Sequence, residues 1–160
     1  MTGAAFDELF RLLVAANVRF VLVGGLALNA WGVVRGTKDV DIVPDPHPDN
    51  LGRLAEVAVE VGGRVQAGEA FAGSSRSISA LLAAGERVFI ETPLGPLDVV
   101  QGIPGVPAYQ QLRDTAVEVD VLGATIFVCS LDDLRTMKRT AGRTRDLADL
   151  EDLDAAHPDD

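Results

Sequence analysis

Apolar residues recur along the chain with two different periods, which predict a mixture of helices and strands. Near the start, five of them follow the helical spacing of three and four residues: Phe6, Leu9, Phe10, Leu13 and Val14. This spacing predicts an amphipathic helix over residues 4–16. Short apolar runs predict strands at residues 20–23, 38–43, 87–91, 97–101, 117–121 and 125–128. The order of these elements predicts an α+β (α/β) domain, a small mixed β-sheet flanked by helices.

Polar and glycine residues indicate where further helices begin and end. A small-residue helix is expected from Leu26 to about Val33, after the turn formed by Gly24 and Gly25. Asp49 or Asn50 is expected to cap a helix that runs to about Val61. Ser130, followed by Asp133, predicts the start of a helix over residues 131–141, and Leu147, Leu150 and Leu153 mark a last one.

The chain is expected to form a single domain over residues 1–154, followed by a short acidic tail at 155–160. Residues 64–86 show little pattern beyond a short helix or strand near residues 78–82. A chain of 160 residues is long enough to bury a substantial core. Apolar residues make up 48% of the sequence and aromatic residues only 5%, so aliphatic side chains are expected to fill that core.

Composition argues against several classes of protein. No apolar run approaches the ~20 residues needed to cross a bilayer, and Asp7 and Glu8 lie where a signal peptide would be basic. We therefore expect a cytoplasmic protein with no membrane partner. The single cysteine, Cys129, and the two histidines exclude a disulfide scaffold and a zinc site built from His and Cys.

The net charge of −10 opposes nonspecific binding to nucleic acid, but the charge is unevenly distributed. Residues 135–145 carry five cations and no acid: Arg135, Lys138, Arg139, Arg143 and Arg145. Residues 146–160 then carry seven acids and no Lys or Arg. One interpretation is a solvated helix face followed by a disordered tail. The other is a cationic segment that binds an anion.

Two aspartates separated by one valine are the first candidate for chemistry. Successive side chains of a strand point to opposite faces, so Asp39 and Asp41 are expected to lie side by side. Such carboxylates repel each other unless a proton or a cation lies between them, and the obvious cation is Mg²⁺. Asp98 is a third candidate, because it lies in a strand that otherwise looks buried, where a carboxylate needs a partner.

Each of these features has a simpler interpretation when taken alone. Two consecutive glycines are usually only a turn, and Asp98 could form an ion pair with Arg87 or Arg113. An Asp-x-Asp pair also occurs in haloacid-dehalogenase-like phosphatases and in glycosyltransferases. No P-loop motif and no Gly-x-Gly-x-x-Gly motif is present, so those phosphate-binding classes do not apply.

Taken together, the features resemble a known signature. An apolar residue, Gly-Gly, thirteen residues and then Asp-Val-Asp-Ile resembles the signature of the DNA polymerase β-like nucleotidyltransferase superfamily. The later Leu-Asp-Val-Val, around Asp98, resembles the segment that carries its third carboxylate. The segments 35–41 and 138–149 resemble the small bacterial branch that includes type IV abortive-infection toxins and minimal nucleotidyltransferases. The resemblance spans residues 18–153 and implies a C-terminal helical hairpin.

The resemblance implies Mg²⁺-dependent transfer of a nucleoside monophosphate from an NTP to an acceptor hydroxyl, with release of pyrophosphate. Two Mg²⁺ ions are implied, with Mn²⁺ as an alternative. By position, Asp39, Asp41 and Asp98 match the catalytic and metal-binding carboxylates, and Gly24 and Gly25 match the phosphate turn. The further contacts to nucleotide or phosphate that it implies are Arg35, Thr37, Lys138 and Arg143.

Several points stay open at this level. The acceptor could be a tRNA 3′ end, a hydroxyl of a partner protein or a small molecule, and a toxin–antitoxin pair is the favoured setting. The alternatives are a catalytically silent antitoxin or nucleotide-binding module of the same fold, and a metal-dependent sugar transferase. Arg145 is expected to pair with Asp149 on a helix surface, and Trp31 is expected to pack rather than to stack on a base.

Overall fold

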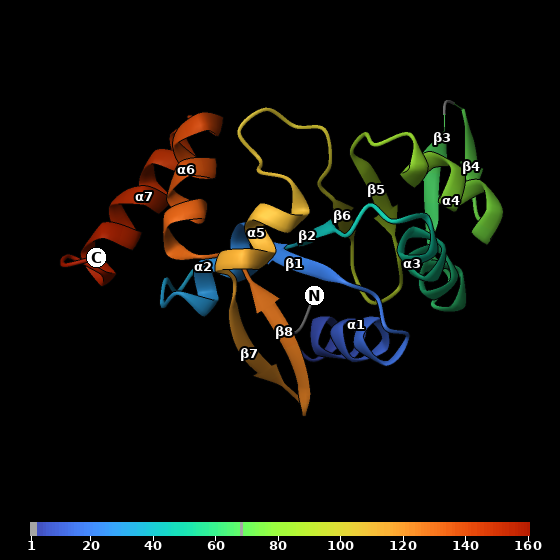
Figure 1. The fold of residues 1–160 in the computed structure, drawn as a ribbon, viewed down its shortest axis with the longest axis horizontal. Helices are drawn as coiled ribbons and strands as arrows, with labels where there is room; N and C mark the ends of the chain where they lie inside the picture. Colours follow the sequence, from blue (N-terminus) through green and yellow to red (C-terminus); the bar gives the residue numbers. More distant parts are fainter. Residues whose placement is uncertain (1–2, 68) are drawn as a thin grey trace.

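A mixed β-sheet forms the centre of the computed structural model, which describes residues 3–67 and 69–160. Within these residues, eight strands form one sheet in the order β4-β3-β5-β6-β2-β1-β8-β7 (Figure 1). The strands are β1 (Phe20–Val23), β2 (Val40–Pro44), β3 (Arg64–Ala67), β4 (Ala70–Ala72), β5 (Val88–Glu91), β6 (Leu97–Val99), β7 (Val117–Val121) and β8 (Ala124–Val128). The predicted α+β architecture with a mixed, helix-flanked sheet is therefore confirmed.

Helices cover the sheet and lie at both ends of the molecule. They are α1 (Gly3–Ala15), α2 (Gly24–Ala30), α3 (Pro48–Glu60), α4 (Ser75–Ala83), α5 (Tyr109–Thr115), α6 (Leu131–Ala141) and α7 (Thr144–Ala156). Figure 1 shows α6 and α7 together at one end of the molecule and α3 and α4 beside β3 and β4 at the other. As expected, the buried core is almost entirely aliphatic.

The register of the central strands determines where the candidate site lies. Strand β2 runs antiparallel to β1, with Val23 opposite Asp41, and parallel to β6, with Asp41 opposite Asp98. All four residues of β1 are buried. The end of β1, Asp41 and Asp98 therefore lie in one row across three neighbouring strands, and the glycine turn begins directly after Val23.

Some predicted element boundaries differ from the structure. Helix α2 begins at Gly24 rather than Leu26 and ends at Ala30, and β2 begins at Val40, so Asp39 precedes the strand. His47, not Asp49 or Asn50, caps α3, because its Nδ1 accepts a hydrogen bond from the Asp49 amide at 3.2 Å. Residues 64–86 contain β3, β4 and α4.

The interpretation of residues 135–145 as a solvated helix face is wrong for two of its members. Arg135 and Lys138 are buried, with 6% and 8% of their surfaces exposed. Arg135 donates hydrogen bonds to the backbone oxygens of Asp160 at 2.9 Å and His157 at 3.2 Å. These contacts hold the last residues of the chain against α6.

Within the described residues, no helix combines the length and apolar character that crossing a membrane requires.

Candidate active site

Three carboxylates converge at the centre of the sheet. One oxygen from each of Asp39, Asp41 and Asp98 lies within 4.8 Å of the other two. Asp98 is 2% exposed, and Asp39 and Asp41 are half-buried. The strand register produces this cluster, because Asp41 and Asp98 are direct neighbours on β2 and β6 and Asp39 lies two residues before Asp41.

The cluster is electrostatically unfavourable without a cation. Burial, and then the nearby charges of Asp98 and Asp39, raise the pKa of Asp41 to about 7. Burial and the charge of Asp98 also raise the pKa of Asp39. The buried Oδ1 of Asp41 has no hydrogen-bond partner among the described residues. Three converging carboxylates, one of which has an unsatisfied buried oxygen, fit a hard divalent cation such as Mg²⁺ or Mn²⁺.

Arg87 is the direct partner of Asp98. Its Nε donates to Asp98 Oδ1 at 2.9 Å, and a second guanidinium nitrogen donates to Asp98 Oδ2. These hydrogen bonds raise the pKa of Arg87. Of the two partners considered from sequence, Arg87 is therefore the correct one, and Arg113 instead stacks on Phe127.

The two glycines of the turn bring the backbone against the acidic cluster. Gly24 has φ of +71°, and a Cβ there would lie 2.0 Å from Asp41 Oδ2. A Cβ at Gly25 would lie 2.7 Å from Thr37 Oγ1. The Thr37 hydroxyl donates to the backbone oxygen of Asp39 at 3.2 Å. Only glycine allows so close an approach at both positions.

Cationic side chains lie on the other side of the site, held by two buried acids of α7. Lys138 Nζ lies 2.9 Å from Asp149 Oδ2 and 3.4 Å from Asp146 Oδ1. Asp149 Oδ2 also accepts from Arg35 at 2.8 Å, and Asp146 Oδ2 accepts from Arg143 Nε at 2.7 Å. The five side chains alternate in charge, so each cation is fixed by a carboxylate.

Asp146, which lies between Lys138 and Arg143, stays ionised. Burial alone would raise the pKa of Asp146, but hydrogen bonds from the Arg143 side chain and backbone and the charge of Lys138 hold it below its usual value. The prediction that Arg145 pairs with Asp149 is wrong, because Asp149 instead forms ion pairs with Lys138 and Arg35. Neither Asp146 nor Asp149 is a surface residue of α7.

One cavity of about 630 Å³ is lined by all nine of the site residues proposed from sequence. They are Gly24, Gly25, Arg35, Thr37, Asp39, Asp41, Asp98, Lys138 and Arg143, and the cavity is also lined by Gly36, Lys38, Arg87 and Arg145. Six of the thirteen lining residues are Lys or Arg, and three are aspartates. Such an arrangement can bind a polyanion together with a divalent cation.

Sequence reasoning missed three residues around this site. Arg87 was considered only as a partner of Asp98, Asp149 only as a surface partner of Arg145, and Asp146 only as part of a segment. Asp146 and Asp149 lie three residues apart on the same face of α7, opposite the cations of α6, which is the one signal that could have identified them. Trp31 packs as expected: its Nε1 donates to the backbone oxygen of Cys129 at 2.9 Å, and its ring contacts His157.

Comparison with solved structures shows that the fold is that of nucleotidyltransferases. The lincosamide antibiotic adenylyltransferase LnuA, in its lincomycin-bound form, superimposes with a TM-score of 0.67 at 15% identity, over 98% of each chain. The antibiotic-resistance factor ANT(2'')-Ia gives a TM-score of 0.61 at 15% identity, over 97% of this chain and 85% of that one.

A third similar structure is a nucleotidyltransferase-like antigenic protein from Paracoccidioides brasiliensis. Its TM-score is 0.63 at 17% identity, over 95% of this chain and 73% of that one. No protein-family model and no curated protein matches the sequence. At these identities, the similarity defines the fold, and the chemistry must be argued from the site itself.

Proposed function

We propose that the protein is a cytoplasmic, metal-dependent nucleotidyltransferase that transfers a nucleoside monophosphate from an NTP to an acceptor hydroxyl. The observation that supports this most strongly is the convergence of Asp39, Asp41 and Asp98 in a cavity whose other walls are cationic. A triphosphate carries about four negative charges, and it needs both a divalent cation and basic side chains when it is partly desolvated.

In this proposal, Asp39, Asp41 and Asp98 hold Mg²⁺, or Mn²⁺ as an alternative. When bound, the metal neutralises charge on the phosphate oxygens and favours the attack of a hydroxyl on phosphorus. The unsatisfied Oδ1 of Asp41 and the raised pKa values of Asp39 and Asp41 support this assignment.

The chain's own residues bind and orient the nucleotide. Lys138, Arg35 and Arg143 contact the phosphates, and the ion pairs with Asp146 and Asp149 hold these cations in place before the nucleotide arrives. Gly24 and Gly25 keep the turn close to Asp41 and Thr37, at the edge of the cavity proposed to take the phosphates. Thr37, whose hydroxyl donates a hydrogen bond to the backbone oxygen of Asp39, lines the same edge of the cavity.

The reaction forms one bond and breaks another at the α-phosphorus. The acceptor oxygen bonds to this phosphorus, while the bond to the bridging oxygen of the β-phosphate breaks and pyrophosphate leaves. The proton of the acceptor hydroxyl passes to Asp98. Catalysis then depends mainly on positioning and on stabilisation of charge.

The solved neighbours favour a small-molecule acceptor over a macromolecule. LnuA was solved with lincomycin bound, and ANT(2'')-Ia was solved with adenylyl-2''-tobramycin. The net charge of −10 also disfavours RNA as the acceptor. The toxin–antitoxin setting rests on the sequence resemblance alone, and the competing function is a nucleotide-binding module that transfers nothing.

The test is a transfer assay with each α-³²P-labelled NTP and Mg²⁺, offered in turn lincomycin, tobramycin and a small-molecule fraction of bacterial extract. We expect a labelled adduct with at least one acceptor and none with the Asp41→Asn variant. Binding of Mg²⁺–NTP without any transfer would favour the silent module. A chain that does not bind Mg²⁺–NTP at all would overturn the proposal.

A further inference from the structure

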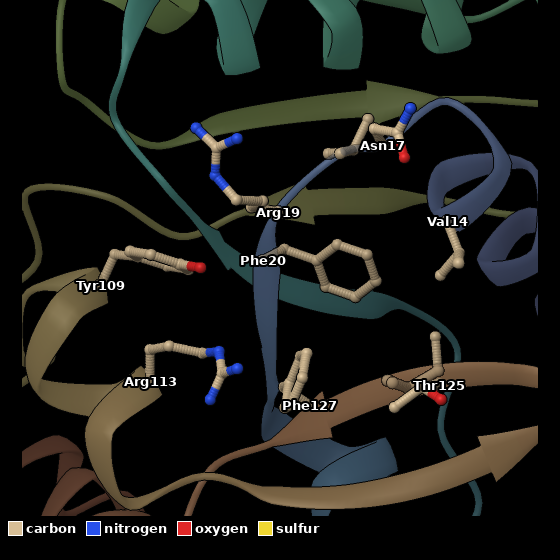
Figure 2. A pocket seen from close by; sticks show the side chains of 10 residues that line it. Val14, Asn17, Arg19, Phe20, Tyr109, Arg113, Thr125 and Phe127 are labelled. Carbon is tan, nitrogen blue, oxygen red and sulfur yellow. The ribbon is translucent and has the colours of Figure 1, made fainter.

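A second cavity, of about 370 Å³, lies at the opposite end of β1 from the glycine turn. Figure 2 shows its lining, which comes from the end of α1, the loop that follows it, the start of β1, helix α5 and strand β8. No residue that lines it also lines the cavity of the candidate active site. It therefore needs an explanation of its own.

The floor of this cavity is apolar and firmly held. Phe20 is 4% exposed, and its ring stacks on that of Phe10 with centroids 6.3 Å apart and planes 12° apart. Ile126, at 1% exposure, lies beside it in β8. Because this floor is supported by the core beneath it, the cavity persists without a ligand.

One of the two arginines at this cavity lacks a carboxylate partner. The guanidinium carbon of Arg113 lies 3.6 Å from the centre of the Phe127 ring, and Arg113 forms no ion pair within the described part of the chain. Stacking of this kind uses the flat face of a guanidinium and leaves its N–H donors in the plane, where a hydrogen bond links Arg113 to the Tyr109 side chain. Arg113 therefore presents a fixed fork of donors at the cavity wall.

The second arginine is already neutralised. Arg19 Nε donates to Asp45 Oδ2 at 2.8 Å, and the Arg19 backbone is anchored by two hydrogen bonds to the buried side chain of Asn50. With Arg19 and Asp45 cancelling each other, the cavity and its rim carry one net positive charge. That charge suits a monoanion and not a triphosphate.

A tyrosine supplies a further donor. Figure 2 shows the hydroxyl of Tyr109 pointing across the cavity toward Phe20, on the same side as Arg113. Burial, and then the charge of Asp45, raise the pKa of Tyr109 above its usual value. The hydroxyl consequently keeps its proton at neutral pH and can donate it in a hydrogen bond.

We propose that this cavity binds a small planar organic monoanion, a carboxylate attached to an aromatic or similarly flat apolar body. The flat body packs on Phe20, while the carboxylate accepts hydrogen bonds from in-plane N–H groups of Arg113 and from the Tyr109 hydroxyl. The volume is at the lower end of the range for small-molecule sites, which fits a ligand of one ring. This site is separate from the proposed nucleotidyltransferase activity.

Benzoate, a one-ring carboxylate, is the probe for this site, and benzyl alcohol is its neutral counterpart. In an NMR titration of the full chain, we expect saturable shifts of the Phe20, Tyr109 and Arg113 amides with benzoate and much weaker ones with benzyl alcohol. Arg113→Gln should weaken benzoate binding about 10-fold, as expected for a charge-assisted hydrogen bond. Tyr109→Phe should weaken it to a lesser degree.

Arg64→Gln is the matched control, because Arg64 also lies over a phenylalanine ring, 4.7 Å from the centre of Phe71, but outside this cavity. It should leave benzoate binding unchanged. Absence of saturable binding to the wild type, equal binding of benzyl alcohol, or an unchanged affinity in Arg113→Gln would each overturn the proposal. A parallel titration with Mg²⁺–ATP reports on the other cavity, so failure of either proposal is recognised separately.

Discussion

The backbone of Gly24 lies against the carboxylate of Asp41, so that a methyl group on Gly24 would come within 2.0 Å of Asp41 Oδ2. The turn after β1 and the Asp41 carboxylate on β2 are thus packed directly against each other. Any side chain at position 24 must displace the carboxylate.

Replacement of Gly24 by alanine should therefore damage both the fold and the site. The positive φ and the overlap with Asp41 predict a loss of about 1–3 kcal/mol in the free energy of unfolding, measured by urea titration, together with weaker Mn²⁺ binding. Gly36→Ala is the control, because it lines the same cavity and a Cβ there meets nothing within 4 Å. Equal stability of the two variants would contradict this account.

The raised pKa of Asp41 predicts an unusual dependence of stability on pH. Because its folded pKa, about 7, lies above the ordinary value of 3.8, folding takes up a proton between these two pH values. The contribution of Asp41 to stability is fully present below about pH 4 and is lost as the pH rises through 7. Asp41→Asn should therefore raise the Tm of the metal-free protein at pH 8 and change it little at pH 4.

Addition of Mg²⁺ should reverse the order of the two proteins at pH 8. A cation bound by the carboxylates stabilises the wild type by mass action, whereas the asparagine variant gains less. Thermal melts of both proteins, with and without Mg²⁺, measure the effect. If the variant melts below the wild type at pH 8 in the absence of metal, the electrostatic argument fails.

Lys138 is expected to be essential for stability as well as for nucleotide binding. Replacement by methionine removes the cation that lies between Asp146 and Asp149, which are 0% and 2% exposed. Removal of one partner from a buried ion pair lowers the free energy of unfolding by about 3–5 kcal/mol. Arg139→Met, one position along α6 and exposed, should change the free energy of unfolding by less than about 0.5 kcal/mol. Similar losses in the two variants would rule out the proposed network.

Arg87 competes with any cation that binds the carboxylate cluster. Replacement by glutamine removes a positive charge hydrogen-bonded to Asp98, so we expect Mn²⁺ to bind several-fold more tightly, as measured by titration with EPR detection. Arg64→Gln, on β3, is the control and should have no effect. Unchanged or weaker Mn²⁺ binding in Arg87→Gln would show that Arg87 helps to organise the site instead.

Local sequence signals predicted much of the fold. Helix α6 was predicted from residue 131 to about residue 141 and is confirmed, because Ser130 accepts a hydrogen bond from the Asp133 amide at its start and Gly142 adopts a left-handed conformation at its end. Helix α5 was not predicted. It has seven residues, one buried side chain, Leu112, and no side-chain cap, so no periodicity could reveal it. The strands β3 and β4 were not predicted either, because with four and three residues they are too short to show a period.

The same contrast applies to the candidate site. The spacing of Asp39 and Asp41 predicted that they lie side by side, and the resemblance to nucleotidyltransferases implied that Asp98 joins them, as it does. The burial of Asp146 and Asp149 was not expected, since acids on the last helix of an acidic chain look exposed. Their burial depends on the packing of α7 against α6 and on Arg35, which lies more than a hundred residues earlier. Such contacts leave no signal in the spacing of residues.

The dependence of Arg35, Lys138 and Arg143 on acids of α7 has a consequence for synthesis of the chain. The glycine turn and the three clustered aspartates emerge from the ribosome before α7 has been translated. Until then, Lys138 and Arg35 lack the carboxylates that hold them in the folded protein. The proposed nucleotide site is therefore assembled only when the last helix folds, and a nascent chain stalled before residue 144 would carry the acidic half of the site without an ordered cationic half.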